Sequence, residues 1–161
     1  MADIHKLIVG ARGWDHSGWN DIFYPGDLPE DWRLSYYANE FSGVLVPESV
    51  WRAADPGIIA EWCDDVADNF LFFLELPDSQ ALNRLPGAAY QEMFGPHWGG
   101  VPDTHTVLVP ADEKWDLRRL RERFDELIAQ PRGVTAPAFF LSGDPPSIDR
   151  MREARLLADM L

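Results

Sequence analysis

Cysteine and lysine are scarce in this chain of 161 residues. Cys63 is its one cysteine, so an intramolecular disulfide and a zinc site built from several cysteines of one chain are both excluded. Its neighbour Trp62 and the helical pattern around it favour a small packing residue over a reactive thiol. Lys6 and Lys114 are the only lysines, and all other basic residues are arginines.

Basic charge is also in deficit, with 14 basic against 27 acidic residues and a net charge of -13. Such a chain repels phosphate backbones and anionic lipid headgroups, so we expect neither nucleic acid nor a membrane among its partners. No apolar run has the length of a membrane span or a signal peptide, which predicts a cytoplasmic location. Glycine-rich phosphate-binding fingerprints are absent, and we predict no cofactor.

The chain does contain the apolar residues of one folded domain, with 46% hydrophobic residues and seven tryptophans. Short apolar runs alternate with helical patterns, which is typical of βα units on a parallel sheet. This pattern predicts an α/β fold with about five strands and four or five helices. The strands are expected at 6–10, 44–46, 70–76, 106–110 and 136–141.

Capping residues and periodicity place the helices. Asp55, Asp116 and Ser147 are the predicted N-caps, and further helices are expected at about 30–41 and 88–94. Residues 95–102 are expected to form a loop because glycine and proline are dense there. An eight-stranded barrel needs roughly 250 residues, and about 200 at the least, so this chain is too short to close one.

Aromatic residues with fixed spacing carry a family resemblance. They are Gly13-Trp14, Trp19, Phe23-Tyr24-Pro25, Trp32, Tyr37-Ala38, Phe41, Trp62 and the run 70–77. This set resembles the YecE-like family, a family of unknown function that folds as a TIM-type barrel. The resemblance implies one partial-barrel domain over 1–161, a truncated TIM-barrel-like parallel sheet similar to the N-terminal half of the family's barrel. It implies no particular reaction.

Departures from the family pattern concern the strand ends. Arg12 stands where the family has serine, Leu45 where it has glutamate, Pro47 where it has asparagine, and Glu75 where it has lysine. Arg52 is retained. In barrels of this kind the chemistry lies at the carboxyl ends of the strands. The resemblance therefore implies a divergent member whose original site has been lost or repurposed.

Charged residues are predicted to gather at this edge of the sheet, namely Arg12, His16, Arg52 and Glu75. They admit two interpretations. The cluster binds an anion and moves a proton, or one of the arginines pairs with Glu75 as a structural ion pair. For His16 the alternatives are a general base beside Asp15 and an ordinary loop histidine.

Aromatic residues near the same edge also admit two interpretations. Trp14, Trp19, Tyr24 and Trp51 form either a pocket wall or a packed core. No short metal-ligand spacing occurs, and we predict no metal site, although a site assembled from separate strands would draw on His16, Glu48, Glu75, His97 and His105. Asp64-Asp65 is expected to be a solvated helix end.

These observations lead to an expected function. The leading hypothesis is a non-catalytic protein that binds a partner or small ligand at the carboxyl ends of the strands. The alternative is an enzyme with a reworked Arg/Glu/His site acting on a small anionic metabolite. No catalytic residue is assigned, and the candidate ligand-binding residues are Arg12, Trp14, His16, Trp19, Tyr24, Trp51, Arg52 and Glu75. Unpaired sheet edges favour a homodimer.

Overall fold

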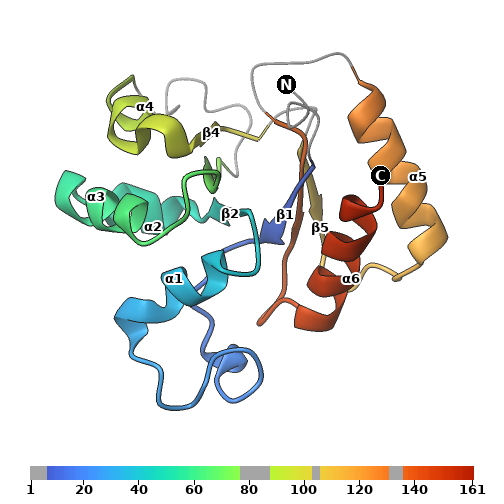
Figure 1. The fold of residues 1–161 in the computed structure, drawn as a ribbon, viewed down its shortest axis with the longest axis horizontal. Coiled ribbons are helices and arrows are strands. Elements are labelled where there is room, and N and C mark those ends of the chain that lie inside the picture. Colours follow the sequence, from blue (N-terminus) through green and yellow to red (C-terminus); the bar gives the residue numbers. More distant parts are fainter. Residues whose placement is uncertain (1–6, 77–87, 103–105, 131–135) are drawn as a thin grey trace.

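The computed structural model describes residues 7–76, 88–102, 106–130 and 136–161. Helices and strands alternate in this part of the chain, as Figure 1 shows. The strands are β1 (Ile8–Ala11), β2 (Gly43–Val46), β3 (Leu71–Leu74), β4 (Trp98–Gly100), β5 (Thr106–Val109) and β6 (Ala138–Leu141). The α-helices are α1 (Arg33–Ala38), α2 (Glu48–Ala53), α3 (Pro56–Asp64), α4 (Ala88–Phe94), α5 (Leu117–Ala129) and α6 (Ile148–Asp159).

All described strand pairs are parallel, so the predicted α/β class with parallel pairing is confirmed. One sheet has the order β1-β6-β5 and the other β2-β3-β4. The last strand, β6, therefore lies beside the first, an order that differs from the chain order of an N-terminal half barrel. Every residue of β1 and of β6 is buried, as is typical of parallel strands that are covered on both faces. The two strands pair with each other along their edges.

The two sheets meet where β1 passes β2. Tyr37 of α1 joins them: its hydroxyl accepts a hydrogen bond from the Ala11 amide at 2.8 Å and donates one to the Gly43 carbonyl at 2.7 Å. A side chain at Gly10 would place its Cβ 2.0 Å from the Gly43 oxygen, so only glycine permits this approach. Beyond the seam, the Gly13 amide bonds the Leu45 carbonyl at 2.8 Å. The strands thus converge toward their carboxyl ends.

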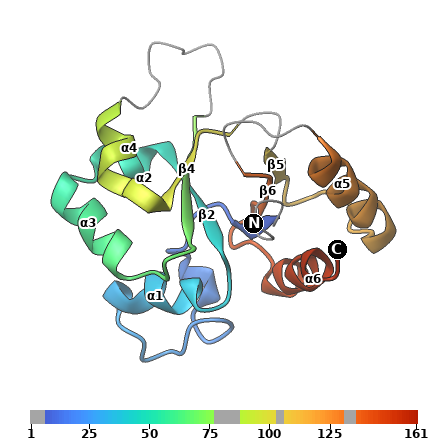
Figure 2. The ribbon, with the colours of Figure 1, turned by 45° about the horizontal axis from the view of Figure 1, so that its top comes forward.

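Helices cover the sheets on two sides. Figures 1 and 2 show α2, α3 and α4 together on one side and α5 with α6 on the other. Leu120, Phe124 and Leu127 form the buried face of α5, and the Phe124 ring packs edge-on against Phe139 of β6. The three predicted N-caps are confirmed: the side chains of Asp55, Asp116 and Ser147 accept hydrogen bonds from the first turns of α3, α5 and α6.

The expected loop at 95–102 is wrong. Gly95–His97 forms a 3-10 turn, and β4 pairs with β3. One glycine that suggested a loop, Gly99, is required by packing, since a Cβ there would lie 2.8 Å from the ring of Phe73. The described residues therefore contain six strands rather than five.

Two helices also differ from expectation. The pattern at 30–41 is divided into a 3-10 turn, Glu30–Trp32, and α1, which ends at Ala38. Helix α2 was not predicted; it begins directly after Pro47, which is the N-cap. Among the described helices, none is long and apolar enough to cross a membrane.

Candidate functional site

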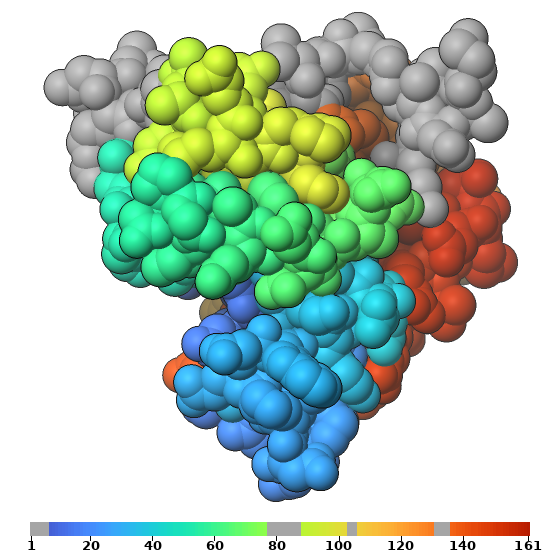
Figure 3. Space-filling view, turned by 60° about the vertical axis from the view of Figure 1, so that its left-hand side comes forward, coloured from blue at the N-terminus to red at the C-terminus, as the bar shows by residue number. Residues whose placement is uncertain are grey.

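A cavity of about 710 Å³ opens at the carboxyl ends of β1 and β2. Figure 3 shows the surface hollowed between α3, drawn in green, and the segment before α1, drawn in blue. Four parts of the chain line the cavity: the turn after β1, the segment leading into α1, the start of α2, and the end of α3. The lining residues are Arg12, Gly13, Trp14, Asp15, His16, Glu30, Asp31, Trp32, Leu34, Pro47, Val50, Glu61, Trp62 and Asp65.

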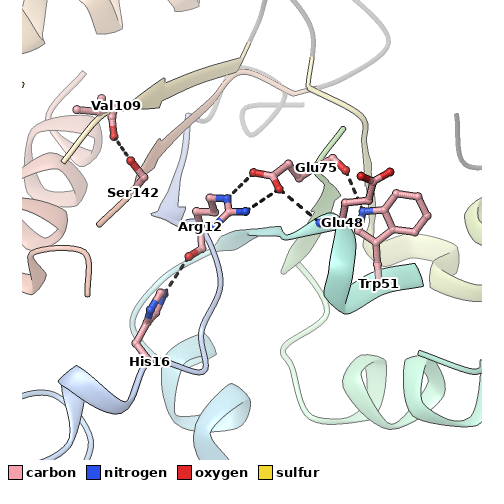
Figure 4. A network of polar contacts seen from close by, with 7 residues as sticks. All are labelled: Arg12, His16, Glu48, Trp51, Glu75, Val109 and Ser142. Atoms are coloured by element: carbon pink, nitrogen blue, oxygen red, sulfur yellow. Dashed lines mark hydrogen bonds and ion pairs between the residues drawn. The ribbon is translucent and has the colours of Figure 1, made fainter. Parts of the chain in front are cut away.

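An ion pair closes the inner end of this site. Arg12, just beyond β1, binds Glu75, just beyond β3, through two hydrogen bonds; one joins Nε to Oε2 and the other spans 2.9 Å from Nη2 to Oε1 (Figure 4). The Glu75 side chain is only 10% exposed, whereas that of Arg12 is 41% exposed. The hydrogen bond to Glu75 raises the pKa of Arg12 above its ordinary value, against a smaller opposing effect of burial. Of the two interpretations of this cluster, the geometry matches the structural ion pair, made by Arg12.

Further hydrogen bonds hold Glu75. The Glu48 amide donates to Oε1 at 3.4 Å, and the Trp51 indole donates to the Glu75 backbone oxygen at 3.0 Å (Figure 4). Arg52 does not pair with Glu75 in the described part of the chain. Its guanidinium pairs with Glu48 at 2.7 Å and lies 4.1 Å from the centre of the Trp51 ring. The retained arginine of the family pattern therefore lies on α2, outside the cavity lining.

His16 lies at the cavity but is held by the backbone. One ring nitrogen, Nε2, is 2.9 Å from the Arg12 carbonyl oxygen, and the ring packs against Trp19 with centroids 4.5 Å apart. Asp15, the predicted partner, instead forms an ion pair with Arg33 of α1. The structure therefore gives His16 no carboxylate of the kind a general base would use.

All four aromatic candidates are buried in the core, and three of them lie outside the cavity lining. Trp19, Tyr24 and Trp51 are all 1% exposed or less, and none lines the cavity. The Trp19 indole donates to the Pro146 carbonyl at 2.8 Å, which ties this loop to the segment before α6. Only Trp14 reaches the cavity wall. For the other three, the core interpretation matches the structure.

Leu45 shows how far this chain departs from the family pattern. The resemblance implies glutamate at this position, and Leu45 is 1% exposed within an apolar cluster. The other buried members of this cluster are Ile8, Phe73, Ala138 and Phe140. A carboxylate at position 45 would be buried without a partner, which costs several kcal/mol, on the order of 3 or more. Leucine here removes the polar group and fills the space between the sheets.

The cavity walls contain three tryptophans. Trp14 and Trp62 pack edge-to-face with centroids 5.1 Å apart, and Trp62 is stacked against Phe72 behind it. Trp32 is different, because 63% of it is exposed. A large exposed indole at the mouth of a cavity is a common feature of ligand-binding surfaces.

Most of the polar lining was missed by sequence reasoning. It consists of carboxylates from two separate segments, Glu30 and Asp31 before α1, and Glu61 and Asp65 at the end of α3. Partial desolvation raises the pKa of Asp65, and the charges of Glu61, Asp64 and Asp31 raise it further. Asp64-Asp65 was interpreted as a solvated helix end, and Asp65 is exposed, but it also lines the cavity. The one available signal was acidic residues at the carboxyl end of a helix, where they are unfavourable.

Metal-ligating residues do not converge in the part of the chain that the structure describes, where no group of three His, Cys, Asp or Glu side chains could hold an ion. His97 is buried, with Nδ1 2.8 Å from the Phe70 carbonyl oxygen. His105 lies outside the described residues.

Comparison with known proteins places this chain in a family. A search of curated proteins gives no match. A crystal structure of a DUF72 family protein from Thermotoga maritima is similar with a TM-score of 0.44 and 16% identity, over 77% of this chain and 51% of that chain. This chain thus spans about half the length of that protein. Residues 8–161 match the family model described as "Protein of unknown function DUF72". The chain therefore belongs to the DUF72 family, which includes the YecE-like proteins.

Proposed function

We propose that this protein binds a small ligand, without transforming it, in the cavity at the carboxyl ends of β1 and β2. One observation carries the proposal. The polar groups at the strand ends are satisfied by each other, as Arg12 and Glu75 are, while the cavity wall beside them contains three indole rings, of which that of Trp32 is largely exposed. A lining of aromatic surface with a few polar groups is typical of small-molecule sites.

The composition of the lining supports binding over catalysis. Among the described residues that line the cavity there is no serine, threonine, cysteine, lysine or tyrosine, the usual nucleophiles and bases besides histidine and carboxylates. His16, the one lining histidine, is hydrogen-bonded to a backbone carbonyl. A catalytic site needs groups matched in position and protonation. The remaining acid–base groups of the lining are its five carboxylates, and no lining nucleophile accompanies them among the described residues.

The second candidate is an enzyme acting on a small anionic metabolite. It is favoured by Arg12 and His16, which both line the cavity. Two of the Arg12 nitrogens are already bonded to Glu75, so an anion would have to displace a carboxylate. This candidate has weaker support than simple binding.

Ligand-observed NMR with a mixed library of small cations, anions, sugars and aromatic compounds tests the proposal. We expect binders whose signals weaken in the Trp32→Ala variant, which removes an exposed ring and leaves the core intact. Trp115→Ala is the control, because Trp115 is outside the cavity lining and shortly precedes α5. Helix α5 lies on the other side of the sheets (Figure 2). A library without any binder sensitive to Trp32→Ala contradicts the proposal. Conversion of a library compound would favour the enzyme instead.

We propose also that the six described strands form part of an opened parallel barrel. The close approach of β1 and β2 supports an order β5-β6-β1-β2-β3-β4, with β6 beside β1 as a closing strand would be.

Leu108 of the outer strand β5 is 43% exposed, which supports pairing of that edge with a second copy. Light scattering after size exclusion tests the homodimer, and a monomer at all concentrations contradicts it. The cytoplasmic location stays a prediction from the sequence.

A further inference from the structure

The charge of the cavity is opposite to what an anionic ligand needs. Five carboxylates line it against one arginine, and that arginine is bound to Glu75. Asp15 is paired with Arg33. The four others have no ion-pair partner within the described part of the chain; they are Glu30, Asp31, Glu61 and Asp65. An anion entering this space meets repulsion, and a cation meets unsatisfied negative charge.

Two of these carboxylates do not stabilise the helix that carries them. Glu61 and Asp65 lie at the carboxyl end of α3, where the helix dipole is negative and acidic side chains are unfavourable. Asp64 adds a third charge in the same turn. Partial desolvation raises the pKa of Asp65, and the charges of these neighbouring carboxylates raise it further. Local rules of this kind are broken most often where function requires it.

The tryptophan rings beside the carboxylates have no arginine over them among the described residues, and Trp32 is 63% exposed. Elsewhere in the described structure the chain places its own arginines near aromatic rings: Arg52 lies 4.1 Å from the centre of Trp51, and Arg150 lies 5.3 Å from that of Trp115. Neither Trp32 nor Trp62 has such a cation among the described residues. An indole face near unpaired carboxylates is the arrangement that recognises quaternary ammonium groups.

The spread of the carboxylates argues against a metal ion as the missing charge. A bound metal ion needs several oxygen ligands at about 2.0–2.6 Å from one point. No such convergence exists among the side chains described here. A cavity of about 710 Å³ with acids on two opposite segments suits a larger cation that touches several of them.

We infer that the ligand of this cavity is an organic cation of the alkylammonium class, with its charged group between Trp32, Trp62 and the carboxylates of Asp31 and Asp65. This inference rests on the proposed binding function and specifies its ligand class. Trp14 and Trp62 form the apolar wall against which the rest of the ligand packs. The Arg12–Glu75 pair is neutral and leaves no unpaired carboxylate at that end for a second positive charge.

Calorimetric titration with choline and with 3,3-dimethylbutan-1-ol, its uncharged carbon analogue, tests the inference. We expect choline to bind about tenfold or more tightly than the neutral analogue, as a cation–π contact with carboxylate support requires. Asp65→Asn should weaken choline binding about fivefold, since one carboxylate of several is lost. Asp68→Asn is the matched control, because Asp68 is exposed and outside the cavity lining. Binding should also weaken as pH falls and Asp65 is protonated.

The outcomes separate the inference from the function on which it rests. Equal binding of choline and its neutral analogue, both sensitive to Trp32→Ala, overturns the cation and leaves a binding site. Binding of sugars or carboxylates at that site with no response to choline does the same. No binding of choline and no Trp32-sensitive binder in the wider library overturns both. An Asp65→Asn variant that binds choline as tightly as Asp68→Asn also overturns the inference.

Discussion

We expect substitution of Arg12 to destabilise the fold more than substitution of its partner Glu75. Arg12→Ala leaves the Glu75 carboxylate in a site where its side chain is 10% exposed, with only the Glu48 amide still donating to it. Glu75→Gln leaves Arg12, whose side chain is 41% exposed and turns to water at little cost. Exposed pairs contribute about 0–1 kcal/mol. Breaking a fully buried pair costs about 3–5 kcal/mol.

Because the pair is only partly buried, the loss of unfolding free energy in Arg12→Ala should fall between these limits, at about 2–3 kcal/mol. The loss in Glu75→Gln should be near 1 kcal/mol, or about the upper limit for an exposed pair. In a domain of this size the first loss lowers the melting temperature by roughly 5–10 °C. Urea unfolding followed by tryptophan fluorescence measures both free energies.

Arg121→Ala is the control for loss of an arginine as such, since Arg121 faces Asp125 in an exposed pair at 3.9 Å. It should cost about 0.5 kcal/mol or less. The reasoning is refuted if Arg12→Ala matches this control. It is refuted equally if Glu75→Gln proves the more damaging of the two substitutions.

Two further predictions concern Tyr37, which joins β1 to β2, and Asp65, which lines the cavity. Tyr37→Phe removes the hydroxyl that joins Ala11 to Gly43, and two buried backbone groups lose their partner. We expect a loss of about 2–3 kcal/mol in urea unfolding, and a loss below about 0.5 kcal/mol contradicts this account. Asp65→Asn should raise the melting temperature at pH 7. The pKa of Asp65 is higher in the folded state than in the unfolded one. Wild-type stability therefore falls as pH rises from the unfolded pKa of Asp65 through its folded pKa. The gain should vanish near pH 3, and an equal melting temperature at pH 7 is the contrary result.

Local chemistry made much of the fold predictable from the sequence. A capping side chain acts on amides two or three residues away, so Asp55, Asp116 and Ser147 mark helix starts without knowledge of the rest. Runs such as 70–76 indicate a buried strand because both faces must be apolar. Helix 88–94 was predicted with the bounds of α4. These features depend on near neighbours in the chain.

Features set by distant contacts were not predictable in the same way. Gly99 is a glycine because β4 passes close to the Phe73 ring, and nothing local distinguishes it from a loop glycine. The partner of Glu75 was open between Arg12 and Arg52, and the answer depends on which strand ends converge. The unpaired carboxylates of the cavity come from two segments that are distant in the sequence, Glu30 and Asp31 and then Glu61 and Asp65. No local spacing pattern could have predicted that these two segments meet.

The departures from the family pattern act as a coupled set once they are placed in space. Glu75 in place of the family's lysine is compatible with Arg12 in place of serine, because the two form one neutral pair. Leu45 in place of glutamate joins the apolar cluster beside them, where a third charge would disturb that pair. Together these residues neutralise and fill the strand ends. The unpaired carboxylates of the cavity lie instead before α1 and at the end of α3, at Glu30, Asp31, Glu61 and Asp65. The ligand that we propose would therefore meet a different part of the scaffold and a different sign of charge.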